Sequence, residues 1–132
     1  MPVKILSVDD SRTIRLIVAN AFRGYDCQVG EAANGEEGLA AVTREKPDLV
    51  ILDVAMPVMD GVTMLTRMKE DPGLSTIPVI MLTSESGGED DRLYFEELGA
   101  HDYLTKPVEE KTLVERAGRV VPLQKRAKGV SP

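Results

Sequence analysis

Hydrophobic and polar positions follow two alternating spacings along the chain. Short, nearly continuous apolar runs are typical of strands buried on both faces of a parallel sheet, and DLVILDV at 48–54 is the most apolar of them. Between these runs, apolar residues recur at the three- and four-residue spacing of amphipathic helices. The pattern predicts strands at 4–8, 27–32, 48–54, 77–83 and 101–105, alternating with helices at 11–23, from Asn34 onward, at 61–70, 89–98 and 109–121.

Local signals mark several helix ends. Asn34 is followed three residues later by Glu37, which is the spacing of a capping box at a helix start. Asp60 can cap the helix predicted to follow it. Gly99 and Pro122 stand where two of the helical patterns stop, as expected for residues that end helices.

Five strand–helix units in succession predict the α/β fold class, as a (βα)5 doubly wound parallel five-stranded sheet. Right-handed crossovers place helices on both faces of such a sheet. No linker divides the chain, so residues 1–122 are predicted to form one domain. The segment LQKRAKGVSP, residues 123–132, is polar and basic and is predicted to be a short, frayed tail.

The composition argues against several classes of protein. Of the 132 residues, 42% are apolar and 29% are charged, as in a soluble globular domain. The net charge of -6 argues against nucleic acid or an anionic membrane as the main partner, because both need a basic surface. Cys27 is the only cysteine, so no intrachain disulfide can form. The chain shows no secretory signal and no apolar run near the roughly 20 residues of a membrane span, which predicts a cytoplasmic protein.

Polar side chains stand at the ends of four of the five predicted strands. Asp9 and Asp10 follow the first strand, and Asp53 comes at the end of the third. Thr83 ends the fourth strand and Lys106 follows the fifth. Because ligands bind outside the carboxyl ends of the strands in such sheets, we expect these five side chains to meet at one edge.

The residue types at this edge favour a magnesium-dependent reaction of phosphate. The adjacent carboxylates Asp9 and Asp10 repel each other unless a cation lies between them, and oxygen ligands without His or Cys favour Mg²⁺. An aspartate is already ionised at neutral pH and can act as a nucleophile. Mg²⁺, Lys106 and the Thr83 hydroxyl would then stabilise a transferring phosphoryl group. Each residue taken alone is commonly a cap, a turn residue or a solvated charge, so the prediction depends on the whole set.

Four segments give the chain a family resemblance. They are, in chain order, VDDSR (8–12), DLVILDVAMPVMDG (48–61), MLTS (81–84) and DYLTKPV (102–108). With them the chain resembles the receiver domain of two-component response regulators, most closely the stand-alone chemotaxis-type regulators. The resemblance covers about residues 3–121 and implies a flavodoxin-like sheet with strand order 2-1-3-4-5.

The resemblance implies a role for each residue at the strand ends. Asp53 matches the aspartate that accepts a phosphoryl group. Asp9 and Asp10 match the acid pair that holds Mg²⁺, with Asp10 as the direct ligand. Asp53 and the backbone carbonyl of Ala55 would complete the protein ligands of the metal. Lys106 matches the lysine that contacts the phosphate.

The resemblance also implies a switch and its partners. Thr83 matches the switch hydroxyl and Tyr103 the switch aromatic; the alternative for Tyr103 is an ordinary core or rim aromatic. The bond between Lys106 and Pro107 would be cis. His101, the only histidine, is expected to be a surface residue. The donor would be a sensor histidine kinase or a histidine-containing phosphotransfer protein. An effector protein would bind the surface of the fourth helix, fifth strand and fifth helix.

Some positions depart from the family pattern. Ala55 and Glu85 occupy positions that tune the lifetime of the acyl phosphate, so that lifetime is left open. Val108 stands where the family often has Phe, and the loop SESGGEDD, residues 84–91, is long and rich in glycine. This loop adjoins the expected effector surface, so the choice of partner is also left open.

Two other functions compete with a phosphorylation switch. A Mg²⁺-dependent phosphohydrolase with an Asp nucleophile would need a second acid two residues after the nucleophile, where this chain has Ala55. A receiver-like adaptor that binds without phosphorylation would not need the complete set of acids. We therefore expect a switch, with no catalysis on an external substrate.

Overall fold

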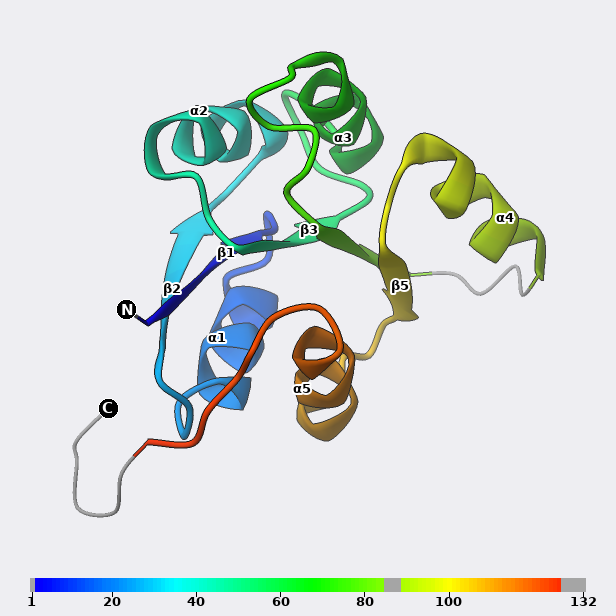
Figure 1. Ribbon diagram of the computed structural model, residues 1–132. Helices are drawn as coiled ribbons and strands as arrows, with labels where there is room; N and C mark the ends of the chain where they lie inside the picture. Colours follow the sequence, from blue (N-terminus) through cyan, green and yellow to red (C-terminus); the bar gives the residue numbers. More distant parts are fainter. Residues whose placement is uncertain (1, 85–88, 127–132) are drawn as a thin grey trace.

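A five-stranded parallel sheet forms the centre of the computed structural model, which describes residues 2–84 and 89–126. Helices cover both faces of the sheet (Figure 1). In chain order the elements are β1 (Val3–Val8), α1 (Arg12–Ala21), β2 (Cys27–Ala32), α2 (Gly35–Glu45), β3 (Leu49–Asp53), α3 (Gly61–Glu70), β4 (Val79–Thr83), α4 (Glu89–Leu98), β5 (Asp102–Thr105) and α5 (Glu110–Gly118).

The strands lie in the order β2-β1-β3-β4-β5, and every neighbouring pair is parallel. This confirms the predicted fold class and strand order. Every residue of β3 and β4 is buried, as expected from their continuous apolar runs, whereas β2 and β5 at the edges contain both buried and more exposed residues. The strand ends that carry the polar residues therefore belong to one sheet.

Alternation along the central strands divides the apolar side chains between two cores. In β3, Leu49 and Ile51 pack in the core beneath α1 and α5. Val50 and Leu52 pack in the core beneath α2, α3 and α4, on the opposite face of the sheet in Figure 1. The first core also contains Val18, Phe22, Leu113 and Ala117, and the second contains Val42, Met64, Leu65 and Phe95.

Two helix starts are capped as predicted. The Asn34 side chain accepts a hydrogen bond from the Glu37 amide at 2.9 Å, and the Asp60 side chain accepts one from the Thr63 amide at 2.8 Å. Each cap satisfies a backbone amide that has no partner within its helix. Asp60 thereby fixes the start of α3 close to the end of β3.

Several predicted helices and strands are longer than the observed ones. The last helix was predicted to reach residue 121, but α5 ends at Gly118. The amides of Arg119 and Val120 instead donate to carbonyls three residues earlier, at Arg116 and Ala117, which is the tighter geometry common at helix ends. β4 begins at 79 rather than 77, directly after a proline that has no amide hydrogen to donate.

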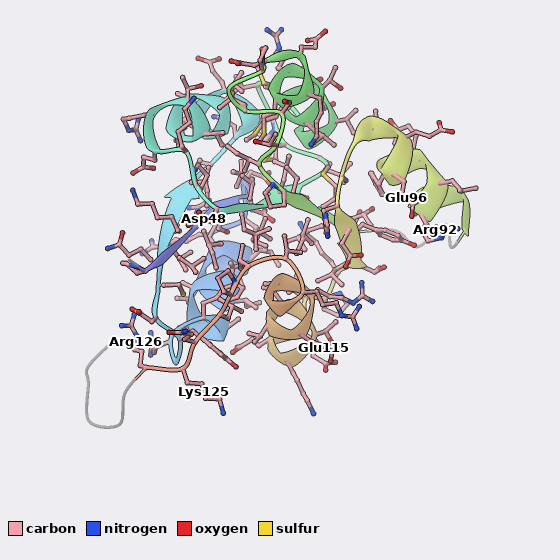
Figure 2. The ribbon with its side chains drawn as sticks, in the orientation of Figure 1. Asp48, Arg92, Glu96, Glu115, Lys125 and Arg126 are labelled. Atoms are coloured by element: carbon pink, nitrogen blue, oxygen red, sulfur yellow. The ribbon has the colours of Figure 1, made fainter. Side chains whose placement is uncertain are left out.

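The prediction of a frayed tail is wrong for residues 123–126. Lys125 forms an antiparallel bridge with Tyr25, in the connection between α1 and β2. The Arg126 guanidinium donates to the carbonyls of Arg23 and Cys27 at 3.1 and 3.2 Å. Figure 2 shows Lys125 and Arg126 beside this connection. Apart from residues 127–132, which are not described, the tail is thus part of the folded domain.

The helices are short. Within the described residues the longest helix, α2, has 11 residues, about half of what a bilayer requires. Across residues 2–84 and 89–126, no helix combines the length and the apolar character needed to cross a membrane.

Candidate functional site

Three carboxylates meet at the carboxyl edge of the sheet, as the sequence predicted. Asp9 and Asp10 follow β1, and Asp53 is the last residue of the neighbouring strand β3. One carboxylate oxygen from each lies within 4.8 Å of the other two. Asp9 and Asp53 are only 1% and 4% exposed, whereas Asp10 faces solvent. We call these three residues the acid cluster.

Lys106 enters the acid cluster from the far side of β4. Its Nζ lies 3.0 Å from Oδ1 of Asp53 and 3.2 Å from Oδ2 of Asp9. The Lys106 amide donates to the carbonyl of Thr83 at 2.7 Å, which fixes the backbone beside the end of β4. The bond to Pro107 is cis, as predicted. The strand-end cation and the acids therefore do converge.

Asp9 is held rigidly but keeps one oxygen available. Its amide donates to the carbonyl of Ala32 at 3.0 Å, and its Oδ1 accepts from the Ser11 amide at 2.8 Å. Its Oδ2 is buried and receives no hydrogen bond from the described residues, although the Lys106 ammonium lies nearby as an ionic neighbour. A buried carboxylate oxygen in this state is a suitable ligand for a cation.

The electrostatics of the acid cluster also favour an added cation. The pKa of Asp53 is raised to about 6, mainly because burial disfavours its charged form. The charges of Asp9 and Asp10 also raise this pKa, whereas the hydrogen bond and charge of Lys106 lower it. Burial alone would lower the pKa of Lys106, but its hydrogen bond to Asp53 and the negative charges of Asp9 and Asp53 outweigh burial, so this pKa is raised. The neighbouring carboxylates thus raise both pKa values, whereas burial raises that of Asp53 and opposes the rise at Lys106.

The donor set fits Mg²⁺, because it consists of oxygens only and includes a buried oxygen that accepts no hydrogen bond from the described residues. Asp9, Asp10 and Asp53 supply hard carboxylate ligands, with no sulfur or imidazole among them. Ala55 lies exposed just after β3, where the resemblance expects its carbonyl to be a further ligand. That ligand assignment stays a prediction.

A glycine that the prediction did not include fixes the end of β3. A Cβ on Gly61 would collide with the carbonyl oxygen of Asp53. The Gly61 amide donates to the Val54 carbonyl at 2.8 Å, which closes the connection between β3 and α3. Only glycine allows this approach, and its place after Asp60 in the DG pair was the available signal.

The middle of the same connection is strained. Val58 has a φ of 71°, which is rare for a β-branched residue, and its side chain is 75% exposed. The Met59 amide donates to the Pro57 carbonyl at 2.8 Å, and the Met59 carbonyl accepts from the Gly35 amide at 2.9 Å. The connection beside Asp53 is therefore anchored to the start of α2.

The two predicted switch residues lie on neighbouring strands. Thr83 ends β4 and is 8% exposed, beside Asp53 at the end of β3. Tyr103 lies on β5 and is half-buried, with its ring 5.5 Å from that of Phe95 on α4. Phe95 in turn contacts Tyr94, which is 49% exposed. The prediction missed this aromatic row, because only the tertiary fold brings α4 against β5.

A cavity of about 340 Å³ adjoins Tyr103 between α4, β5 and α5. Arg116 of α5 pairs with Asp102 of β5 at 2.9 Å along one wall. Arg92 and Glu96, labelled in Figure 2, come from α4 on the other side. The cavity lies on the surface where the resemblance expects an effector to bind.

The remaining predicted positions have different outcomes. His101 is exposed, as expected for a surface residue, and it also lines the cavity beside Tyr103. Val108 is half-buried and packs against the core beneath α1 and α5. Glu85, together with the middle of the loop that contains it, lies outside the described residues.

Known proteins match this chain over most of its length. Residues 5–118 match the response regulator receiver domain family. Protein PilH of Pseudomonas aeruginosa is 38% identical over 118 residues, which cover 89% of this chain and 97% of PilH. Response regulator PleD of Caulobacter vibrioides is 40% identical over 117 residues, but the match spans only 25% of PleD. The chain thus corresponds to one part of some relatives and to nearly all of others.

Solved structures agree with this result. The chemotaxis response regulator CheY4 of Vibrio cholerae superposes with a TM-score of 0.84 at 32% identity, covering 92% of this chain and all of CheY4. A CheY-like receiver domain protein from Methanospirillum hungatei superposes with a TM-score of 0.78 at 28% identity, covering 90% and 93% of the two chains. With the acid cluster at the strand ends and these matches, the chain belongs to the response regulator receiver domain family.

Proposed function

We propose that the protein is a phosphorylation-activated switch of a two-component system. In this proposal Asp53 accepts a phosphoryl group from a phosphohistidine, and the protein then binds an effector with a different affinity. The observation that carries the proposal is the acid cluster, in which one oxygen from each carboxylate lies within 4.8 Å of the other two, with the Lys106 ammonium 3.0 Å from Asp53.

The chemistry requires one bond to form and one to break. A carboxylate oxygen of Asp53 bonds to phosphorus while the bond from the donor imidazole nitrogen to phosphorus breaks. Mg²⁺, held by Asp9, Asp10 and Asp53, would neutralise charge on the transferring group. Lys106 lies within hydrogen-bond distance of Asp53 and can meet the oxygens of the arriving group. Because Asp9 and Asp53 are buried, access of water to the acyl phosphate would be limited.

The switch would proceed through the neighbouring strands. Phosphorylation adds up to about two negative charges and three acceptor oxygens at Asp53. The Thr83 hydroxyl, at the end of the adjacent strand, is a suitable donor to one of these oxygens. Movement of Thr83 would change the space available to Tyr103, whose ring lies between β5 and Phe95. The surface of α4, β5 and α5 would then differ between the two states.

Partners follow from the same chemistry. The donor would be a sensor histidine kinase or a histidine-containing phosphotransfer protein, and the effector would be a protein that binds beside the 340 Å³ cavity. The net charge of -6 supports neither nucleic acid nor an anionic membrane as a partner. The cytoplasmic location stays a prediction.

The competing functions have less support. A phosphohydrolase would need an acid where this chain has the methyl group of Ala55, so we propose no turnover of external substrates. An adaptor independent of phosphorylation would not explain why three carboxylates, two of them buried, are gathered at one edge of the sheet.

The proposal is tested by mapping the modified residue. The protein is incubated with Mg²⁺ and a small phosphodonor, and the label is trapped and located by mass spectrometry. We expect the label on Asp53 and its loss in Asp53→Asn. Asp60→Asn is a matched control, because Asp60 lies in the same connection but caps α3. A full yield of label in Asp53→Asn would show that the acceptor is another residue.

A further inference from the structure

Arg15 connects the backbone of the acid cluster to the edge strand β2. It lies near the start of α1, and its Nη1 donates to the carbonyl oxygen of Asp9 at 2.6 Å. Its Nε donates to Oε1 of Glu31, on β2, at 2.9 Å. The Arg15 side chain is only 16% exposed. Because the guanidinium is planar with its donors in fixed directions, two such contacts fix its orientation.

The Asp9 carbonyl belongs to the peptide group that leads into Asp10. This group is planar, so a hydrogen bond that holds its oxygen also fixes the direction in which the backbone of Asp10 continues. On the other side, the Asp9 amide is held by Ala32 and its carboxylate by the Ser11 amide. Arg15 therefore supplies the restraint between the two acids.

We propose that Arg15, oriented by Glu31, is a positioning residue for the cation site formed by Asp9 and Asp10. By fixing the peptide between these acids, it presents both carboxylates to one Mg²⁺ ion. Arg15 and Glu31 carry opposite charges, so the pair acts through geometry rather than through net charge. This inference rests on the proposed function, because both concern the same cation.

The experiment measures Mg²⁺ affinity by calorimetry in the full chain. Replacement of an outer partner of a metal ligand typically weakens metal binding by about 10- to 100-fold, so we expect Arg15→Met to weaken it by roughly 10-fold. Glu31→Gln keeps an acceptor for the Nε of Arg15, so it should lose less Mg²⁺ affinity than Arg15→Met. Asp10→Asn serves as the reference for loss of a direct ligand.

A matched control separates positioning from general stability. Arg116→Met removes another partly buried ion pair, to Asp102, at a surface away from the acid cluster. We expect it to lower the free energy of unfolding without changing Mg²⁺ affinity. In metal-free Arg15→Met, hydrogen exchange of the Asp10 amide should become faster than in wild type, because its peptide group is no longer held.

Arg15→Lys covers the case in which Arg15→Met does not fold. The lysine keeps the charge but cannot reach two acceptors in fixed directions, so its Mg²⁺ affinity should also fall. Wild-type Mg²⁺ affinity in Arg15→Lys, or in folded Arg15→Met, would overturn this inference but not the proposed function. Absence of Mg²⁺ binding by the wild type would overturn the proposed function with it.

Discussion

Lys106 reaches across the end of β4 to place its ammonium 3.0 Å from Oδ1 of Asp53. The two residues follow β5 and end β3, strands that do not pair with each other because β4 lies between them. The contact therefore links the two sides of the β4 end, where Thr83 is located. A change of charge at Asp53 would therefore act directly on Lys106, which lies in the connection between β5 and α5.

The pH dependence of stability should report the buried charge of Asp53. In metal-free protein the pKa of Asp53 is about 6 in the folded state, against an ordinary value of 3.8. The folded protein therefore binds the proton more tightly than the unfolded protein does. The free energy of unfolding should then fall as pH rises from about 4 to about 7, by up to about 3 kcal/mol. Denaturant titrations at several pH values measure this change.

The matched variant for this prediction is Asp53→Asn, which has no carboxyl group to titrate. It should be more stable than metal-free wild type at pH 7 and similar to it at pH 4, and Mg²⁺ should narrow the difference by stabilising wild type. Parallel stability profiles for the two proteins would show that Asp53 titrates normally in the folded state.

Gly61 should tolerate no side chain. In Gly61→Ala the added methyl group would collide with the Asp53 carbonyl, so the end of β3 or the start of α3 must move. We expect a loss of about 1–3 kcal/mol in the free energy of unfolding, together with weaker Mg²⁺ binding. Gly24→Ala is the control, because a Cβ there meets no atom within 4 Å. Equal losses in the two variants would contradict the steric explanation.

Thr83→Ala should separate phosphorylation from signalling. It leaves Asp53 and Lys106 in place, so labelling of Asp53 should continue. The response of Tyr103 should be lost, because one hydrogen bond to a charged acceptor, worth about 1.5–3 kcal/mol, is removed from the activated state. Ring resonances of Tyr103 are compared by NMR with and without beryllium fluoride as a phosphoryl mimic. The same shift in wild type and Thr83→Ala would mean that the signal follows another route.

Arg126 should stabilise the domain from a position outside the predicted core. Arg126→Ala removes the hydrogen bonds to the Arg23 and Cys27 carbonyls but keeps the backbone bond to Gly24. We expect a loss of about 1–2 kcal/mol in the free energy of unfolding. The neighbouring side chain of Lys125 is exposed, so Lys125→Ala should have little effect on the free energy of unfolding. Unfolding curves of the two variants that coincide would show that the guanidinium contributes nothing.

The sequence alone determined features that depend on neighbouring residues. Continuous apolar runs such as the one in β3 predict strands, because burial on both faces is a property of the segment itself. The caps at Asn34 and Asp60 were predictable since each side chain binds an amide three residues away. The order of strands and helices then implied that Asp9, Asp53 and Lys106 share one edge.

Only the tertiary structure decided which atoms meet at that edge and what supports them. The bond from Arg15 to the Asp9 carbonyl, the fit of Gly61 against Asp53 and the row from Phe95 to Tyr103 each join separate elements. So does the attachment of Arg126 to the start of β2, about 100 positions away in the chain. Such contacts depend on the packing and register of whole elements, and a local pattern of apolar and polar residues does not specify these.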